Sequence, residues 1–130
     1  MITKRLLVLE ISKQGKVRVK LSGSNEVRDA LYALLQLIEI GKVTTYGLLA
    51  RCLGIRPRHV AYLLKNNQNP VIIPCHRVVK SDLSLGGYTL YGRKCPNFKR
   101  KLLMIEGIRI NSRGRVNKEC VISAISDLLS

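Results

Sequence analysis

One cysteine of this chain stands among residues that an inert core thiol does not need. In the stretch "PVIIPCHRVV", residues 70–79, Cys75 follows a proline and precedes His76 and Arg77. The thiolate is the reactive form of cysteine, and a neighbouring histidine can take the thiol proton. A carboxylate must then orient the imidazole, and Glu106, between an isoleucine and a glycine, is the most conspicuous candidate. These residue types permit an activated cysteine nucleophile.

The same residues also permit a purely structural interpretation. Cys75 would then be a core residue, because buried cysteines are common. His76 would be a surface residue whose hydrogen bonds are satisfied, and Glu106 a charge at a helix end. The segment 71–75 is predicted to be short, buried and extended. Adjacent side chains of a strand point to opposite faces, so Cys75 and His76 would pair directly only at a turn, or otherwise through a water. The residue types alone leave both interpretations open.

The chain carries a large excess of positive charge. Lys and Arg number 23 against 8 Asp and Glu, a formal net charge of +15, and residues 51–80 contain basic residues but no carboxylate. A charge run is usually a solvated surface, but an excess this large favours a polyanion, most commonly nucleic acid. Because aromatic residues make up only 5% of the chain, contact with a duplex backbone is favoured over stacking of single-stranded bases.

Length and composition narrow the class of protein. A chain of 130 residues with 46% hydrophobic content suits one globular domain. No apolar run approaches the roughly 18 residues of a membrane span, and the N-terminus resembles no cleaved signal. The 4 cysteines are widely spaced without a CxxC pair, which argues against a zinc ribbon. An intracellular chain would keep them reduced, although the sequence also permits a disulfide such as Cys95–Cys120.

The elements that must position these residues are mainly helical, with one small β-hairpin first. Residues 5–12 and 16–22 are typical of two strands, and "KQG" between them suits a turn. Ser24 or Asn25 can cap a helix whose apolar residues recur at helical spacing as far as Ile38, and Gly41 would end it.

Two short helices are predicted next, separated by a tight turn. Thr44 or Thr45 can cap the first, Gly54 closes it, and Pro57 suits the first position of the second. This is a helix-turn-helix pattern, although an ordinary helical hairpin gives the same signal. The positive charge favours the DNA-binding interpretation.

The last part of the chain predicts two further helices. Pro96 begins one that Gly107 ends, and Asn117 caps a final helix that runs to Leu129. In the first of these, we expect the apolar residues to lie inward and the basic ones largely outward. The inward set is Phe98, Leu102, Leu103 and Ile105, and the outward set is Lys99, Arg100 and Lys101.

Several motifs together resemble one family. "PCHRVV" after "NPVII", followed by "GGY" and then "KRKLLMIEG", resembles the O6-alkylguanine-DNA alkyltransferases over roughly residues 39–110, the family's DNA-binding and active-site domain. The resemblance implies a winged helix-turn-helix-like fold. It also implies DNA repair by a single-turnover methyltransferase, which flips O6-alkylguanine out of duplex DNA and transfers the alkyl group irreversibly to its own cysteine. The expected partner is double-stranded DNA that contains alkylated guanine. The resemblance also implies a monomer with an intracellular location, and it implies no metal or organic cofactor.

The resemblance also assigns catalytic roles to individual positions. Cys75 would accept the alkyl group, and His76 would deprotonate it through a bound water. Glu106 would orient the imidazole of His76. Asn67 would brace the turn that carries the reactive cysteine.

Further positions would form the pocket and hold DNA. Tyr46, Tyr88 and Thr89 would line the pocket, where the carbonyls of Cys75 and Val78 would read the exocyclic amine of guanine. Arg58 would enter the base stack as the target nucleotide leaves, and Tyr46 would crowd the phosphate. The DNA-binding set is Arg58, Tyr46, Arg56, Lys65 and Arg77.

The sequence also departs from the family pattern. Only about forty residues precede Gly41, so the family's N-terminal α/β part would be truncated. The expected division is a hairpin (1–23) as remnant or replacement, the alkyltransferase domain (24–110) and a C-terminal extension with a helix (111–130). After Tyr88, bulky Leu90 and Tyr91 stand in the loop that the resemblance places at the wall of the alkyl pocket.

Three alternatives belong to other classes of protein. A non-repairing sensor of alkylated DNA is one, but the alkyltransferase-like proteins of that kind lack the acceptor cysteine, which Cys75 supplies here. A helix-turn-helix regulator would not need a Cys–His–Glu set. A cysteine hydrolase is disfavoured by the positive charge and by the lack of an evident oxyanion motif.

Overall fold

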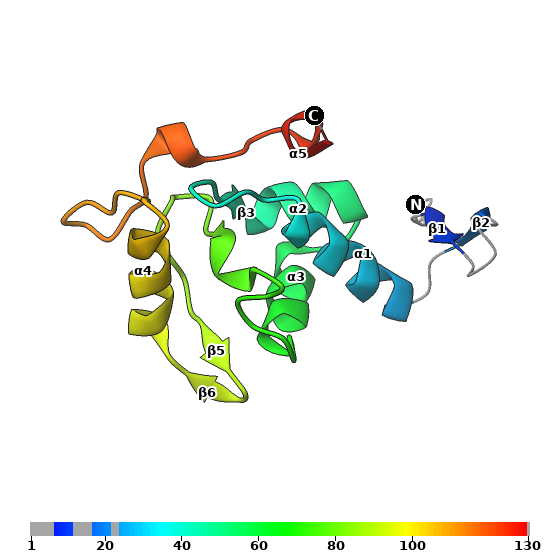
Figure 1. Ribbon diagram of the computed structural model, residues 1–130, viewed down its shortest axis with the longest axis horizontal. Coiled ribbons are helices and arrows are strands. Elements are labelled where there is room, and N and C mark those ends of the chain that lie inside the picture. Colours follow the sequence, from blue (N-terminus) through cyan, green and yellow to red (C-terminus); the bar gives the residue numbers. More distant parts are fainter. Residues whose placement is uncertain (1–6, 12–16, 22–23, 130) are drawn as a thin grey trace.

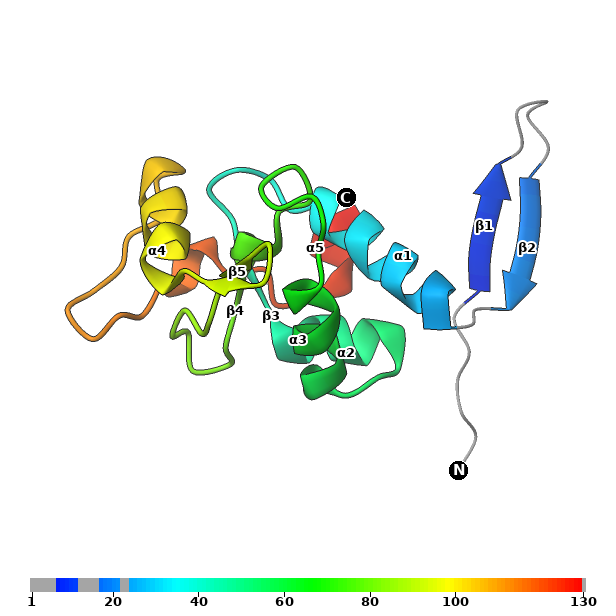
Figure 2. The ribbon, with the colours of Figure 1, turned by 90° about the horizontal axis from the view of Figure 1, so that it is seen from below.

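The fold is mainly helical, with three small two-stranded sheets in the part of the chain that is described (Figure 1). The computed structural model describes residues 7–11, 17–21 and 24–129. Strands β1 (Leu7–Ile11) and β2 (Val17–Leu21) pair antiparallel, with Leu7 opposite Leu21 and Ile11 opposite Val17. This confirms the predicted hairpin, whose "KQG" turn lies outside the described residues. The hairpin stands beyond the N-terminal end of the first helix in two perpendicular views (Figures 1 and 2).

Helix α1 (Ser24–Gln36) forms one wall of the main core. Its apolar residues recur at helical spacing, so Leu31 and Leu35 face inward and are fully buried. The chain continues past the helix to Ile38, which is also buried, and turns at Gly41 with φ +89°. This positive φ is readily adopted only by glycine, which explains the residue at that turn.

The helix-turn-helix pattern is confirmed. After the short strand β3 (Thr44–Thr45), helix α2 (Tyr46–Leu53) begins with a hydrogen bond of 3.1 Å from Leu48 N–H to the Thr45 hydroxyl. Gly54 ends α2 in a left-handed conformation, and helix α3 (Pro57–Lys65) begins with its proline. The two helices pack through buried apolar residues, which are Leu48, Leu49, Leu53, Val60, Leu63 and Leu64.

The prediction of a buried extended segment at residues 71–75 is wrong. Val71 and Ile72 are 44% and 77% exposed, and Val71 has φ +74°. The backbone turns here because Ile73 N–H binds the Asn69 carbonyl at 2.9 Å, so the chain folds back on itself. A 3₁₀ turn, η1 (Cys75–Arg77), follows and leads into strand β4 (Val78–Val79), which pairs parallel with β3.

The loop after Tyr88, which was expected at the pocket wall, is a short hairpin. Strands β5 (Thr89–Leu90) and β6 (Arg93–Lys94) pair antiparallel through a turn in which Tyr91 and Gly92 both have positive φ, 50° and 82°. Positive φ at both central residues is the type I′ geometry that matches the twist of the strands. Tyr91 is exposed, so its ring is not part of the core.

The orientation predicted for helix α4 (Pro96–Ile105) is wrong at three residues. Lys99 is fully buried, whereas Phe98 and Ile105 are 39% and 82% exposed. Lys99 and the buried Leu103 are four residues apart and therefore share one face of the helix. That face lies against β4 and the loop after it, where the carbonyls of Val78 and Leu85 accept hydrogen bonds from the Lys99 ammonium. A charge that was expected in solvent is thus held inside the protein.

The C-terminal segment packs onto the domain, but not as the single helix that was expected. Asn117 caps a 3₁₀ turn, η2 (Lys118–Cys120), and the last helix, α5 (Ile125–Leu129), is short. Val43 exchanges backbone hydrogen bonds of 2.9 and 2.7 Å with Cys120 and Ile122, so residue 121 lies parallel to residue 43. Ile122 and Leu128 join the core formed by α1, α2 and α3. The three-part division of the chain stays a prediction.

All four cysteines, Cys52, Cys75, Cys95 and Cys120, carry free thiols. None of the described helices combines the length and the apolar character that crossing a membrane requires.

Candidate active site

Cys75 begins the η1 turn and is almost completely buried, at 4% exposure. Its N–H binds the Ile73 carbonyl at 2.7 Å. The Asn67 side chain holds the same turn, because its amide donates to the Ile73 carbonyl at 3.0 Å and its oxygen accepts from Asn69 N–H at 2.9 Å. Asn67 therefore lies where a bracing residue should, at the base of the loop that carries the thiol.

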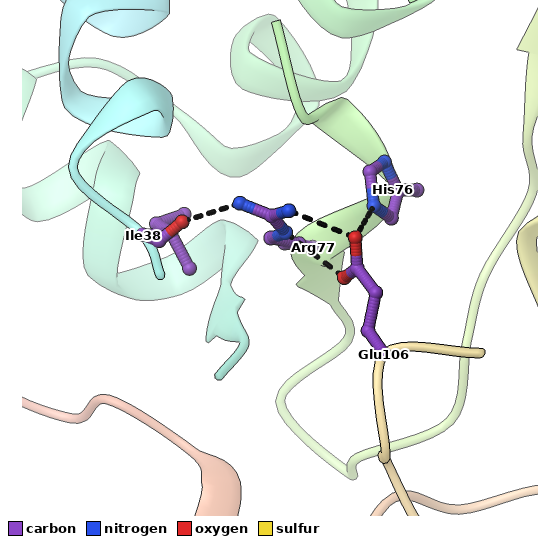
Figure 3. A network of polar contacts seen from close by, with 4 residues as sticks. All are labelled: Ile38, His76, Arg77 and Glu106. Carbon is purple, nitrogen blue, oxygen red and sulfur yellow. Dashed lines mark hydrogen bonds and ion pairs between the residues drawn. The ribbon is translucent and has the colours of Figure 1, made fainter. Parts of the chain in front are cut away.

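Three charged or polar side chains next to Cys75 form one network (Figure 3). His76 is fully buried, and its Nε2 lies 3.0 Å from Glu106 Oε2. Arg77 donates through Nε and Nη2 to the two oxygens of the same carboxylate at 2.9 and 2.8 Å. Its Nη1 donates to the Ile38 carbonyl at 2.6 Å. Arg77 thus ties the end of α4 to the segment after α1 and holds Glu106 beside His76.

The expected phosphate contact of Arg77 does not fit this arrangement. Its side chain is only 12% exposed, and its guanidinium is bound to Glu106 and Ile38. The positive charge of Arg77 is therefore neutralised inside the protein, where a bidentate pair with a carboxylate is strong. We assign Arg77 to the support of Glu106 instead of the DNA-binding set.

The network determines which nitrogen of His76 can take a proton. Burial alone would raise the pKa of Glu106, but the hydrogen bonds from Arg77 and His76 outweigh it and lower that pKa. The carboxylate is then ionised and only accepts, so His76 Nε2 must donate and Nδ1 is left without a proton. His76 Nδ1 is buried and has no hydrogen-bond partner among the described residues. Burial lowers the pKa of His76, against the pull of Glu106, so the imidazole is neutral and can act as a base.

A cavity of about 180 Å³ opens beside the thiol. Its lining includes Cys75, Tyr46, Tyr88, Thr89, Gly87 and Lys65. A cavity of about 150 Å³ accepts a benzene molecule, so this one is of the size of a small aromatic group. The expected pocket residues Tyr46, Tyr88 and Thr89 are thus brought together around Cys75.

Two tyrosines give this cavity its chemical character. Tyr88 is buried and stacked on Phe98, with ring centres 6.1 Å apart, and its hydroxyl has no hydrogen-bond partner among the described residues. Burial raises the pKa of Tyr88, and the nearby Cys75 raises it further. Burial likewise raises the pKa of Tyr46 to about 12. Both hydroxyls therefore keep their protons and can donate to a ligand.

Lys99 is a site residue that the sequence reasoning missed. Its ammonium donates to the carbonyls of Val78, Leu85 and Gly87 at 2.6, 2.5 and 3.5 Å, and lies 5.8 Å from the centre of the Tyr46 ring. Burial lowers the pKa of Lys99 to about 8, although Cys75 opposes this change. The available signal was its position four residues before Leu103, on the inward face of α4.

The remaining predicted residues fall into two groups. Val78 is buried and does not line the cavity; its carbonyl, the atom expected to read guanine, already accepts from Lys99. Arg56 and Arg58 are exposed at the start of α3. Arg58 lines a second hollow together with Tyr46, so it lies next to the mouth of the Cys75 cavity. Within the described residues, no three His, Cys, Asp or Glu side chains gather to hold a metal ion.

The structure combines a helix-turn-helix, the β5–β6 hairpin and a buried thiol beside a His–Glu pair in one small domain. Residues 26–108 match the family model described as 6-O-methylguanine DNA methyltransferase, DNA binding domain. The chain belongs to this family. The resemblance noted from the motifs is therefore confirmed.

Individual relatives agree with this assignment. The methylated-DNA--protein-cysteine methyltransferase of Pyrobaculum aerophilum is 50% identical over 99 residues, which are 74% of this chain and 64% of that protein. The crystal structure of S. pombe Atl1 with damaged DNA containing O6-carboxymethylguanine has a TM-score of 0.63 at 25% identity, covering 78% and 99% of the two chains. The O6-methylguanine-DNA methyltransferase structure from Pyrococcus kodakaraensis has a TM-score of 0.52 at 37% identity, covering 65% and 50%. The matched region spans 55–64% of the length of the first curated relatives.

Proposed function

We propose that this chain repairs DNA by moving an alkyl group from the O6 atom of guanine in a duplex to the sulfur of Cys75. The observation that carries the proposal is the position of Cys75, a buried thiol in the lining of a cavity beside the His76–Glu106 pair. The family of the chain and the names of its curated relatives support the same reaction. We expect the chain to act on DNA as a monomer inside the cell.

The site residues account for each step of this transfer. His76 Nδ1 takes the thiol proton, directly or through a water, while Glu106 stabilises the imidazolium through Nε2. The sulfur of Cys75 attacks the alkyl carbon, the bond from that carbon to O6 breaks, and its electron pair moves onto the guanine. Tyr88 donates a hydrogen bond to the guanine oxygen or a ring nitrogen as negative charge develops there.

The product explains why one molecule would act once. Transfer leaves a thioether on Cys75, and no group in the described site supplies a nucleophile and an activation path to cleave it. A sulfur–carbon bond of this kind does not return to the thiolate by proton transfer. Cys75 therefore stays alkylated, and the protein is consumed with the lesion.

The base must leave the duplex to reach Cys75. Extrusion costs a few kcal/mol, and a side chain that enters the gap offsets part of this cost. Arg58, exposed at the start of α3 and next to the cavity mouth, is placed for this role, with Tyr46 beside it. Arg56, at the N-cap of α3, and Lys65, its last residue, are exposed at opposite ends of the helix and would contact phosphates.

Mass spectrometry after incubation with a duplex containing O6-methylguanine tests the proposal. We expect one methyl group to replace the thiol hydrogen in a peptide containing Cys75, and none in a Cys75→Ser variant. Methylation of Cys52, Cys95 or Cys120 at matching stoichiometry would contradict the assignment. Tight binding of the lesion without any transfer would instead indicate a sensor of damaged DNA.

A further inference from the structure

The C-terminal segment, which lies beyond the region that the family model matches, lines a positively charged hollow together with residues of that region. Residues 109–118 include Arg109, Arg113, Arg115 and Lys118 and no carboxylate, and they follow the matched residues 26–108. Arg115 and Lys118 line one side of a hollow of about 520 Å³, and Ser81 and Asp82 line the other. We call this the C-terminal basic hollow.

Backbone contacts fix this hollow in place. Val116 is buried, its N–H binds the Leu83 carbonyl at 2.9 Å, and Arg115 pairs with Ser84 in an antiparallel bridge. On the other side of Lys118, the pairing of Cys120 and Ile122 with Val43 anchors the chain in the domain. In Figure 1 the segment runs from the end of α4 back to α2 and α1. Arg115 and Lys118 are exposed on this anchored backbone and do not belong to a loose tail.

The hollow is continuous with the surface that holds Arg58. Ser81 lines both the C-terminal basic hollow and the second hollow that contains Tyr46, Arg58 and Lys80. A side chain atom added at Gly47, in the first turn of α2, would lie 3.3 Å from the Ser81 hydroxyl, so the two hollows meet at the start of the helix-turn-helix. One path of exposed cations therefore runs from Arg58 through Lys80 to Arg115 and Lys118.

Two carboxylates lie near this path and do not cancel it. Asp82 accepts hydrogen bonds from the Ser84 N–H and hydroxyl at 3.0 and 2.6 Å. These bonds, together with the charges of Arg115 and Lys80, lower the pKa of Asp82. Glu119 accepts a hydrogen bond of 3.1 Å from the Asn117 amide. The hydrogen bonds come from neutral groups and leave both acids charged, but the four cations outnumber the two acids, so the path keeps an excess of positive charge.

We propose that Arg115 and Lys118 bind backbone phosphates of the same duplex whose lesion enters the Cys75 cavity. Duplex DNA is the partner because a linear polyanion matches a row of separated cations that starts at the base-extruding arginine. The inference rests on the proposed function, since it extends the surface around Arg58. It assigns a DNA contact to a segment beyond the matched domain.

Salt dependence of binding tests this proposal, because each neutralised phosphate adds about 0.9 to the slope of log affinity against log salt concentration. In the Arg115→Gln/Lys118→Gln double variant, we expect this slope to fall by nearly two, on duplexes with and without O6-methylguanine, measured by fluorescence anisotropy. The matched control is Arg100→Gln/Lys101→Gln, which removes two exposed cations from the outer side of α4. Its slope should stay close to that of the wild-type protein.

A second readout separates this proposal from the repair reaction. The double variant should react with free O6-benzylguanine at the wild-type rate, because Arg115 and Lys118 do not line the Cys75 cavity. A single Lys118→Glu variant, changed only at an exposed side chain, should also reduce the slope. Equal slopes in the double variant, the control variant and the wild-type protein would overturn the DNA contact. Normal binding without transfer to Cys75 would instead overturn the proposed function alone.

Discussion

Replacing Lys99 by methionine should remove a pH-dependent part of the stability of this domain. Lys99 is fully buried, and its pKa falls from the ordinary 10.5 to about 8. A lysine with a lowered pKa binds its proton less readily in the folded than in the unfolded chain. Stability therefore rises as pH increases from the folded to the unfolded pKa, and is lost as pH falls through the folded value.

The expected magnitude follows from the interval between these two pKa values. Each pH unit within it corresponds to about 1.4 kcal/mol, so the full interval corresponds to about 3 kcal/mol. The sequence pI is about 10.2, and solubility near it limits the useful range. Between about pH 7 and 9.5, the free energy of unfolding of the wild-type protein should rise by roughly 2 kcal/mol relative to that of Lys99→Met.

Urea unfolding at a series of pH values measures this difference. At any one pH, two opposing effects change the free energy of unfolding of Lys99→Met. The substitution removes a buried charge, which stabilises the fold. It also removes the donor to three carbonyls, and each carbonyl left unsatisfied costs about 1–3 kcal/mol. The difference in free energy of unfolding between the wild type and Lys99→Met varies with pH only through the titration of Lys99. Lys101→Met, on the exposed side of the same helix, is the control and should run parallel to the wild type. Parallel curves for wild type and Lys99→Met would refute the buried, titrating lysine.

Three other changes test the site directly. Glu106→Gln should slow alkyl transfer at neutral pH by about 100-fold, the lower range for loss of a general base, with partial recovery as alkaline pH ionises the thiol; an unchanged rate in stopped-flow assays would rule out the triad. Because the pKa of Glu106 is lowered by its partners, the wild type should also lose stability as pH falls through that value, and Glu106→Gln should not. Arg58→Ala should slow repair of duplex DNA more than reaction with free O6-benzylguanine, which needs no extrusion; equal losses would contradict the role. Asn67→Ala should destabilise the domain by about 1–3 kcal/mol in urea unfolding, since it leaves Asn69 N–H without its partner and removes one of the two donors to the Ile73 carbonyl; an unchanged midpoint would show that the brace is dispensable.

The sequence by itself determined the local elements and the reactive motif. Thr45, Gly54 and Pro57 act within one helical turn of their own position, so the boundaries of α2 and α3 were readable from neighbouring residues. The same holds for Cys75 and His76, which are adjacent in the chain, and the motif around them matches the family. The catalytic, pocket and DNA-binding roles of single residues stay predictions.

Only the tertiary structure decided the contacts of Arg77 and Lys99 and the course of residues 71–75. Arg77 meets a carboxylate 29 residues away, and Lys99 meets a carbonyl 21 residues away. No local pattern predicts such partners, and a basic side chain without a known partner is expected in solvent. The apolar letters of "VII" are likewise typical of a strand, but a strand needs a neighbour to pair with, and the hydrogen bonds of Asn67 and Asn69 fold this segment into a turn. Side chains whose energy depends on distant contacts are placed by the fold, because burial and pairing outweigh local preference.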